Sequence, residues 1–148
     1  MSDQDFLQEF MARFNEFRLI EAKLVLGKFK DNSCQKAFSL LHDMELTYAA
    51  GAYYACLIIA CTSIEACLNH ELGNEGNLKN KLEKSGYTSE ADWLREVRNA
   101  IVHKNDSSVV RNHFDEEHEE YLKKLCRKAF VLVHTVYFEP IKSTVTVD

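Results

Sequence analysis

The chain has little of what marks several protein classes. It holds one proline and five glycines among 148 residues, and 28% of its residues are charged, which is typical of a helix-rich globular protein rather than a disordered or fibrous one. Its five cysteines are odd in number and include no C-x-x-C pair. They therefore predict buried, reduced thiols in a cytoplasmic protein, not a disulfide framework.

Basic residues are not in excess, since the formal net charge is −5 and the pI is near 5.7. A general nucleic-acid coat protein is thereby disfavoured, and any RNA contact should be local. No basic segment leads into an apolar run at the N-terminus, so we expect no signal peptide. The uncharged, largely apolar stretch over residues 49–64 is shorter than the roughly 20 residues of a membrane span. It predicts a buried central helix, with no membrane among the partners.

Metal-ligand patterns are also scarce. Cys67 and His70 stand three residues apart, but no second Cys/His pair completes a tetrahedral set. The sequence therefore predicts neither a metal site nor another cofactor.

The hydrophobic residues, 46% of the chain, suffice for one domain over residues 1–148. Their spacing predicts an all-α, up-and-down helical bundle with an additional N-terminal helix: an amphipathic helix within residues 1–30, a core over 33–138 and a tail over 139–148. The expected helices cover residues 3–29, 33–50, 52–72, 78–84 and 114–137, together with one that begins at Thr88 or Ser89. The phenylalanines of the first helix predict packing in the core or in a dimer. Residues 143–147 have strand-like composition with no evident partner.

The most informative stretch is Arg98-Asn99-Ala100-Ile101-Val102-His103. At about 100° per residue, Asn99 and His103 share nearly one face of a helix, whereas Arg98 and His103 point roughly 140° apart. One ideal helix cannot aim both at the same atom. A two-fold pairing of helices could line one groove with both kinds of side chain, because isologous contacts bring the same surface to itself.

This stretch resembles the ribonuclease motif of the HEPN family, in which an Arg, a polar residue and a later His lie on one helix of a small bundle. Arg98, Asn99 and His103 match its three positions. Residues 60–69, A-C-T-S-I-E-A-C-L-N, are similar to the preceding family helix. In one branch of the family a Tyr modified by a partner follows two residues after the His. Here that position is Asn105, so such a partner is not expected.

The resemblance implies a homodimer with a composite RNA-cleaving site that uses no metal. His103 would carry protons because an unperturbed imidazole titrates near neutrality. Arg98 would hold the phosphate oxygens with its planar fork. Asn99 would fix the imidazole or bind phosphate. The implied setting is a toxin or a defence or stress effector, with an antitoxin or regulatory protein as a further partner.

Several residues have open assignments. Glu65 would hold Arg98 in place or form an ion pair that only orders the bundle. Arg95, Lys104 and Arg111 are candidates for RNA contacts. His113 and His118 are expected on the exposed side of the last helix, and His42, His70 and His134 in packing or at the surface. The acidic run that begins at Asp115 predicts a solvated first helical turn.

The whole motif also has a purely structural interpretation, in which Arg98 and Asn99 bond loop carbonyls and His103 complements the helix dipole. The corresponding alternative function is a non-catalytic HEPN-like module that dimerises or binds a protein or nucleotide.

Overall fold

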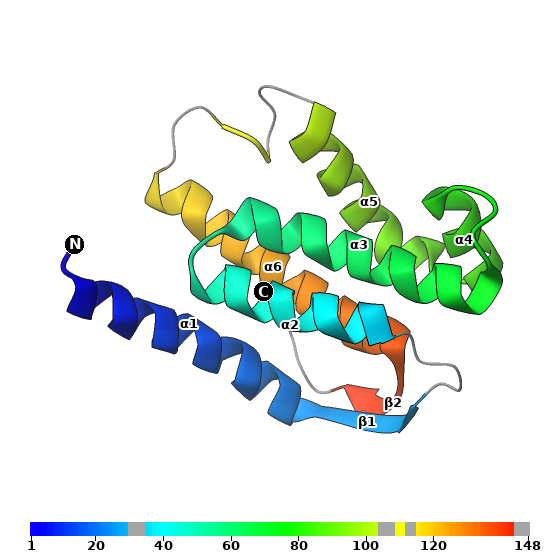
Figure 1. The fold of residues 1–148 in the computed structure, drawn as a ribbon, viewed down its shortest axis with the longest axis horizontal. Coiled ribbons are helices and arrows are strands. Elements are labelled where there is room, and N and C mark those ends of the chain that lie inside the picture. The colour runs from blue at the N-terminus through cyan, green and yellow to red at the C-terminus, as the bar shows by residue number, and fades with distance from the viewer. Residues whose placement is uncertain (30–34, 104–108, 112–114, 144–148) are drawn as a thin grey trace.

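The computed structural model describes residues 1–29, 35–103, 109–111 and 115–143, and it confirms an all-α helical bundle. Its helices are α1 (Asp3–Lys23), α2 (Gln35–Ala49), α3 (Tyr53–Leu72), α4 (Leu78–Ser85), α5 (Thr88–His103) and α6 (Glu116–Tyr137). Figure 1 shows α2 and α3 side by side with α6 behind them, α1 along one edge, and α4 and α5 on the opposite edge. The expected helices are therefore present. Most of their observed boundaries differ from the predicted ones by only a few residues.

The first helix is shorter than its hydrophobic spacing predicts, because residues 24–29 form a strand. This strand, β1 (Leu24–Phe29), pairs antiparallel with β2 (Phe138–Ser143), so that Leu24 stands opposite Ser143. The expectation of a helix to residue 29 was wrong, and so was that of a tail without a partner as far as Ser143. Residues 144–147 lie outside the described residues.

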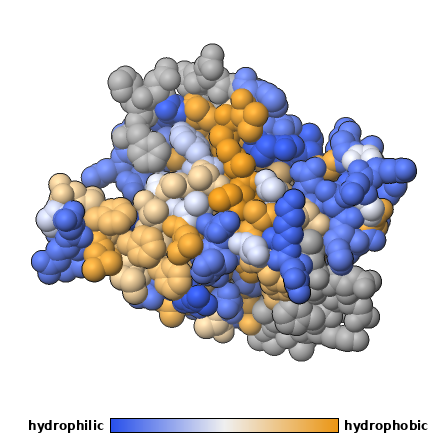
Figure 2. All heavy atoms as spheres, in the orientation of Figure 1, coloured by the Kyte–Doolittle hydropathy of each residue, from blue (hydrophilic) through white to orange (hydrophobic). Residues whose placement is uncertain are grey.

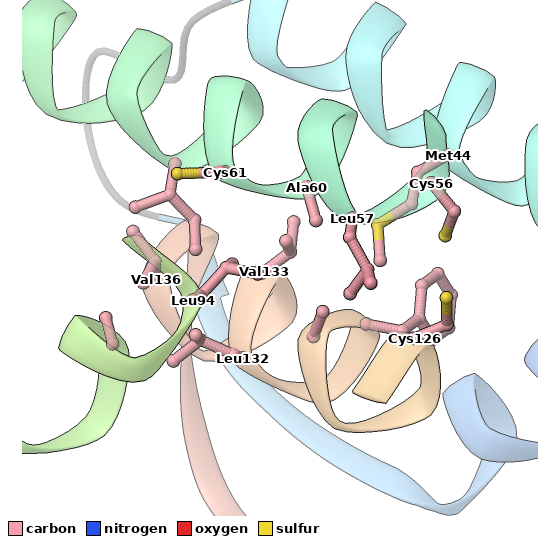
Figure 3. Close-up of a cluster of buried hydrophobic side chains, with 14 of the residues drawn as sticks. Met44, Cys56, Leu57, Ala60, Cys61, Leu94, Cys126, Leu132, Val133 and Val136 are labelled. Atoms are coloured by element: carbon pink, nitrogen blue, oxygen red, sulfur yellow. The ribbon is translucent and has the colours of Figure 1, made fainter. Parts of the chain in front are cut away.

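The centre of the bundle is α3, which packs on α2, α5 and α6. Figure 3 shows side chains of α3, among them Leu57 and Ala60, directed toward Val133 and Cys126 of α6. This helix is also long and apolar enough to cross a membrane by length and composition alone, a property that the core helix of a bundle shares. Cys56, Cys61, Cys67 and Cys126 are buried, as expected, and Cys34 lies outside the described residues.

The N-terminal helix joins the bundle through its C-terminal half. Phe17 is 1% exposed, whereas Phe6 is 45% exposed, and Phe10 and Phe14 are partly buried. The phenylalanine stripe is therefore core packing only at its C-terminal end. Figure 2 shows orange and light-orange hydrophobic surface at the left of the molecule, where the N-terminal part of α1 lies.

A buried arginine of α1, Arg13, contacts the turn between α2 and α3. Arg13 donates from Nε to the carbonyl oxygen of Ala49 at 2.8 Å. Its guanidinium lies 3.6 Å from where a Cβ on Gly51 would stand, and Gly51 has a positive φ of 80°. Gly51 thus provides both the turn and the close approach that its position in the sequence suggests.

His134 ties the last helix to the first. Its Nδ1 lies 2.9 Å from the carbonyl oxygen of Phe130, and its Nε2 lies 3.2 Å from Oε2 of Glu21. Each ring nitrogen of His134 therefore has an oxygen within hydrogen-bond distance. The hydrogen bond from His134 lowers the pKa of Glu21 below its usual value of 4.5, against an opposing effect of burial.

This pair predicts acid sensitivity. A carboxyl group whose pKa falls on folding adds stability above its unfolded pKa and loses it as the pH drops through the folded value. The free energy of unfolding of the wild type should therefore fall between pH 5 and pH 3 more steeply than that of Glu21→Gln. Urea denaturation at both pH values measures the difference. Equal slopes for the two proteins would show that the pair contributes nothing to acid stability.

Candidate functional site

The motif helix α5 is anchored on one side only. Ala91, Leu94 and Ala100 are buried against the bundle. Trp93 is partly buried, and its ring lies 4.2 Å under the ammonium group of Lys128. The expected core residue Val102 is instead 54% exposed. The C-terminal end of α5 therefore presents side chains to solvent, and the motif lies there.

Arg98 is partly buried at the contact between α5 and α3. Burial raises the pKa of the Cys61 thiol to about 11, the positive charges of Arg98 and Arg95 oppose this rise, and Glu65 adds to it. Arg98 and Glu65 thus lie close enough to act on one buried thiol.

The guanidinium of Arg98 nevertheless has no partner among the described residues. Within the described ranges it has no ion-pair partner, and its Nε is buried without a hydrogen bond. The contact with Glu65 considered from the sequence is therefore not an ion pair in this part of the chain. A buried donor without an acceptor is costly, so a ligand oxygen at this position would be stabilised.

His103 is the last residue of α5 and is exposed, while Asn99, one turn earlier, is partly exposed. No hydrogen bond or ion pair joins Arg98, Asn99 and His103 to one another in the described structure. Five residues of helix separate Arg98 from His103 by about 7.5 Å along the axis. One chain by itself does not assemble the three side chains around a single point.

The additional basic residues differ in their surroundings. Arg95 donates from Nε to Oδ1 of Asp92 at 2.8 Å. This ion pair uses one of the donor groups of the Arg95 guanidinium. Arg111 is exposed, and its backbone N–H lies 3.4 Å from the Tyr54 hydroxyl oxygen. Lys104 lies outside the described residues. Arg111 is thus the freer of the two described candidates for an RNA contact.

The expectation that His118 lies on the exposed side of α6 was wrong. His118 is 1% exposed, and its Nε2 lies 3.0 Å from the hydroxyl oxygen of Tyr54. The sequence held a signal for this, because His118 precedes Leu122 and Cys126 at four-residue intervals on the buried face. Tyr54 was likewise not singled out. His113 lies outside the described residues.

The other histidines follow the sequence analysis. His42 and His70 are exposed, and His134 is buried in packing. Among the described residues, no group of three or more His, Cys, Asp or Glu side chains could hold a metal ion.

Comparison with known proteins gives no further guide, because no family model, curated protein sequence or solved structure matches this chain.

Proposed function

We propose that the chain is a metal-independent endoribonuclease whose active site forms between two copies of α5. The observation that carries this proposal is the half-buried guanidinium of Arg98, which has no carboxylate partner in the described structure and whose Nε lacks a hydrogen bond. A cationic fork without such a partner is suited to the non-bridging oxygens of a phosphodiester.

His103 would supply acid–base chemistry. Its exposed position at the end of α5 leaves both ring nitrogens accessible to a substrate. One imidazole would take the proton of the RNA 2′-hydroxyl as its oxygen attacks phosphorus. The second copy of His103 would give a proton to the departing 5′-oxygen. The products are a 2′,3′-cyclic phosphate and a 5′-hydroxyl, so all atoms and protons are accounted for without a cofactor.

A second copy is needed because the side chains of one chain point apart. The surface beside the motif is suited to such a contact. Ile58 and Ile59 of α3 are partly exposed, and Val102 of α5 is largely exposed. Figure 2 shows hydrophobic surface continuing from the middle of the molecule toward α5. If two copies buried this hydrophobic surface of Ile58, Ile59 and Val102 against each other, their motif helices would come together.

The proposed setting is a cytoplasmic toxin or a defence or stress effector, controlled by an antitoxin or other regulatory protein. The negative formal net charge of −5 supports contact with a short RNA segment rather than with a long one.

Cleavage of a labelled single-stranded RNA tests the proposal. We expect cutting that persists in EDTA and leaves a 2′,3′-cyclic phosphate end. A matched RNA with a single 2′-deoxynucleotide at the cut position should resist cleavage there, because the attacking hydroxyl is absent. The mechanism would be contradicted if EDTA abolished cleavage, or if the RNA with the 2′-deoxynucleotide were cut at that position as fast as the unmodified RNA. RNA binding without turnover would favour the non-catalytic binding module.

A further inference from the structure

A polar cavity lies at a place where no described α5 residue forms part of the lining. It has a volume of about 360 Å³ and is lined by residues from the start of α2, the second half of α3 and the loop that follows it: Lys36, Ala66, Asn69, His70 and Asn74. Among the residues that the structure describes, no carboxylate is part of this lining. The neighbouring acid on α3, Glu71, instead accepts a contact from Sγ of Cys67 at 3.7 Å.

A buried cation stands behind this cavity. Lys81 of α4 is 3% exposed, on the helix face where Leu78 and Leu82 are also buried. Its ammonium group donates a hydrogen bond to Oδ1 of Asn69. In the described ranges it has no carboxylate partner. A buried ammonium normally has an anion nearby, because a neutral amide offsets only part of its lost hydration.

The bond from Lys81 also fixes the direction of the Asn69 amide. An ammonium group only donates, so the oxygen of Asn69 must face Lys81. The Nδ2 group of Asn69 then remains available on the side of the cavity, and it has no acceptor among the described residues. Lys36 and His70 are exposed beside it. The cavity thus gathers an ammonium, an imidazole and two amide side chains.

We propose that this cavity binds the phosphate group of a small phosphate monoester, of mononucleotide size or smaller. A phosphate dianion offers several acceptor oxygens to the donors of the lining, and its charge complements Lys36 and the buried Lys81. The volume lies at the small end of the range for ligand pockets. None of the lining residues belongs to the motif helix, so the site does not depend on ribonuclease activity.

Calorimetric titration with inorganic phosphate, adenosine 5′-monophosphate and adenosine tests the proposal. Adenosine 5′-monophosphate, inorganic phosphate or both should bind, and adenosine should not. Binding should shift the imidazole NMR signals of His70. Lys36→Met should weaken binding roughly tenfold or more, the effect of one charge-assisted hydrogen bond.

Lys79→Met is the matched control, because Lys79 is exposed on α4 outside the lining and the substitution removes the same charge. It should change the affinity less than twofold. An equal loss of affinity in the two lysine variants would overturn the proposal and would indicate non-specific electrostatic attraction. An absence of binding by either phosphate compound at millimolar concentration would also overturn it. Binding should persist in His103→Ala, which separates this site from the ribonuclease.

Discussion

Replacing His103 with Ala is expected to slow RNA cleavage about 10²–10⁴-fold, the usual contribution of a general acid or base. The imidazole is exposed at the end of α5, so its removal should leave the free energy of unfolding nearly unchanged. Single-turnover cleavage of a labelled RNA, with circular dichroism and denaturation of the same samples, measures both effects. Arg98→Lys should also slow cleavage, because it keeps the charge but loses the planar fork.

His42→Ala is the matched control, since His42 is another exposed histidine, located on α2. It should cleave at the wild-type rate. Mixed dimers test whether both copies of His103 act at one site. If wild-type chains are exchanged with an excess of His103→Ala chains, activity should fall with the square of the wild-type fraction. A linear decrease would show that each site needs one imidazole, and no decrease in the homogeneous variant would rule out His103 as a catalytic residue.

Phe17→Ala is expected to destabilise the bundle by about 3–5 kcal/mol, the range for removing a buried aromatic ring. The Phe17 ring is stacked between Tyr48 at 4.0 Å and Phe130 at 4.1 Å, measured between ring centroids. It therefore joins α1 to both α2 and α6. Since domains are stable by about 5–15 kcal/mol, the variant should be close to unfolding at modest temperature. Denaturant titration at neutral pH gives the difference.

Phe6→Ala removes the same atoms from the exposed end of the same helix. It should cost less than about 1 kcal/mol, because Phe6 remains 45% exposed in the folded chain. A comparable loss in both variants would mean that the N-terminal end of α1 is buried in solution by a contact that the single chain lacks.

The helices could be predicted from the sequence because their cores repeat at helical spacing. The apolar composition of α3 in particular indicated the most enclosed element, and it lies at the centre of the bundle. Local pattern failed for β1, where Leu24, Val25 and Leu26 continue an apolar run that suits helix or strand equally. The choice is made by pairing with β2, more than a hundred residues later, which no local window contains.

The candidate site was predictable in its residue types but not in its arrangement. The order of Arg98, Asn99 and His103 suggested phosphate chemistry from the sequence alone. The absence of an ion pair between Arg98 and Glu65 in the described structure depends on how α5 packs on α3. Likewise, the bond between Lys81 and Asn69 joins α4 to α3, and nothing in the sequence sets Lys81 apart from the two other lysines of this short helix.

The pairing of β1 with β2 has a consequence for biosynthesis. The helix α1 leaves the ribosome before α6, yet its docking partners include α6 and, through β1, a strand that follows α6. The ring of Phe17 cannot be covered on both sides until α6 has emerged. Nascent chains should therefore carry an unprotected aromatic surface through most of translation, and this is the segment that a chaperone would shield.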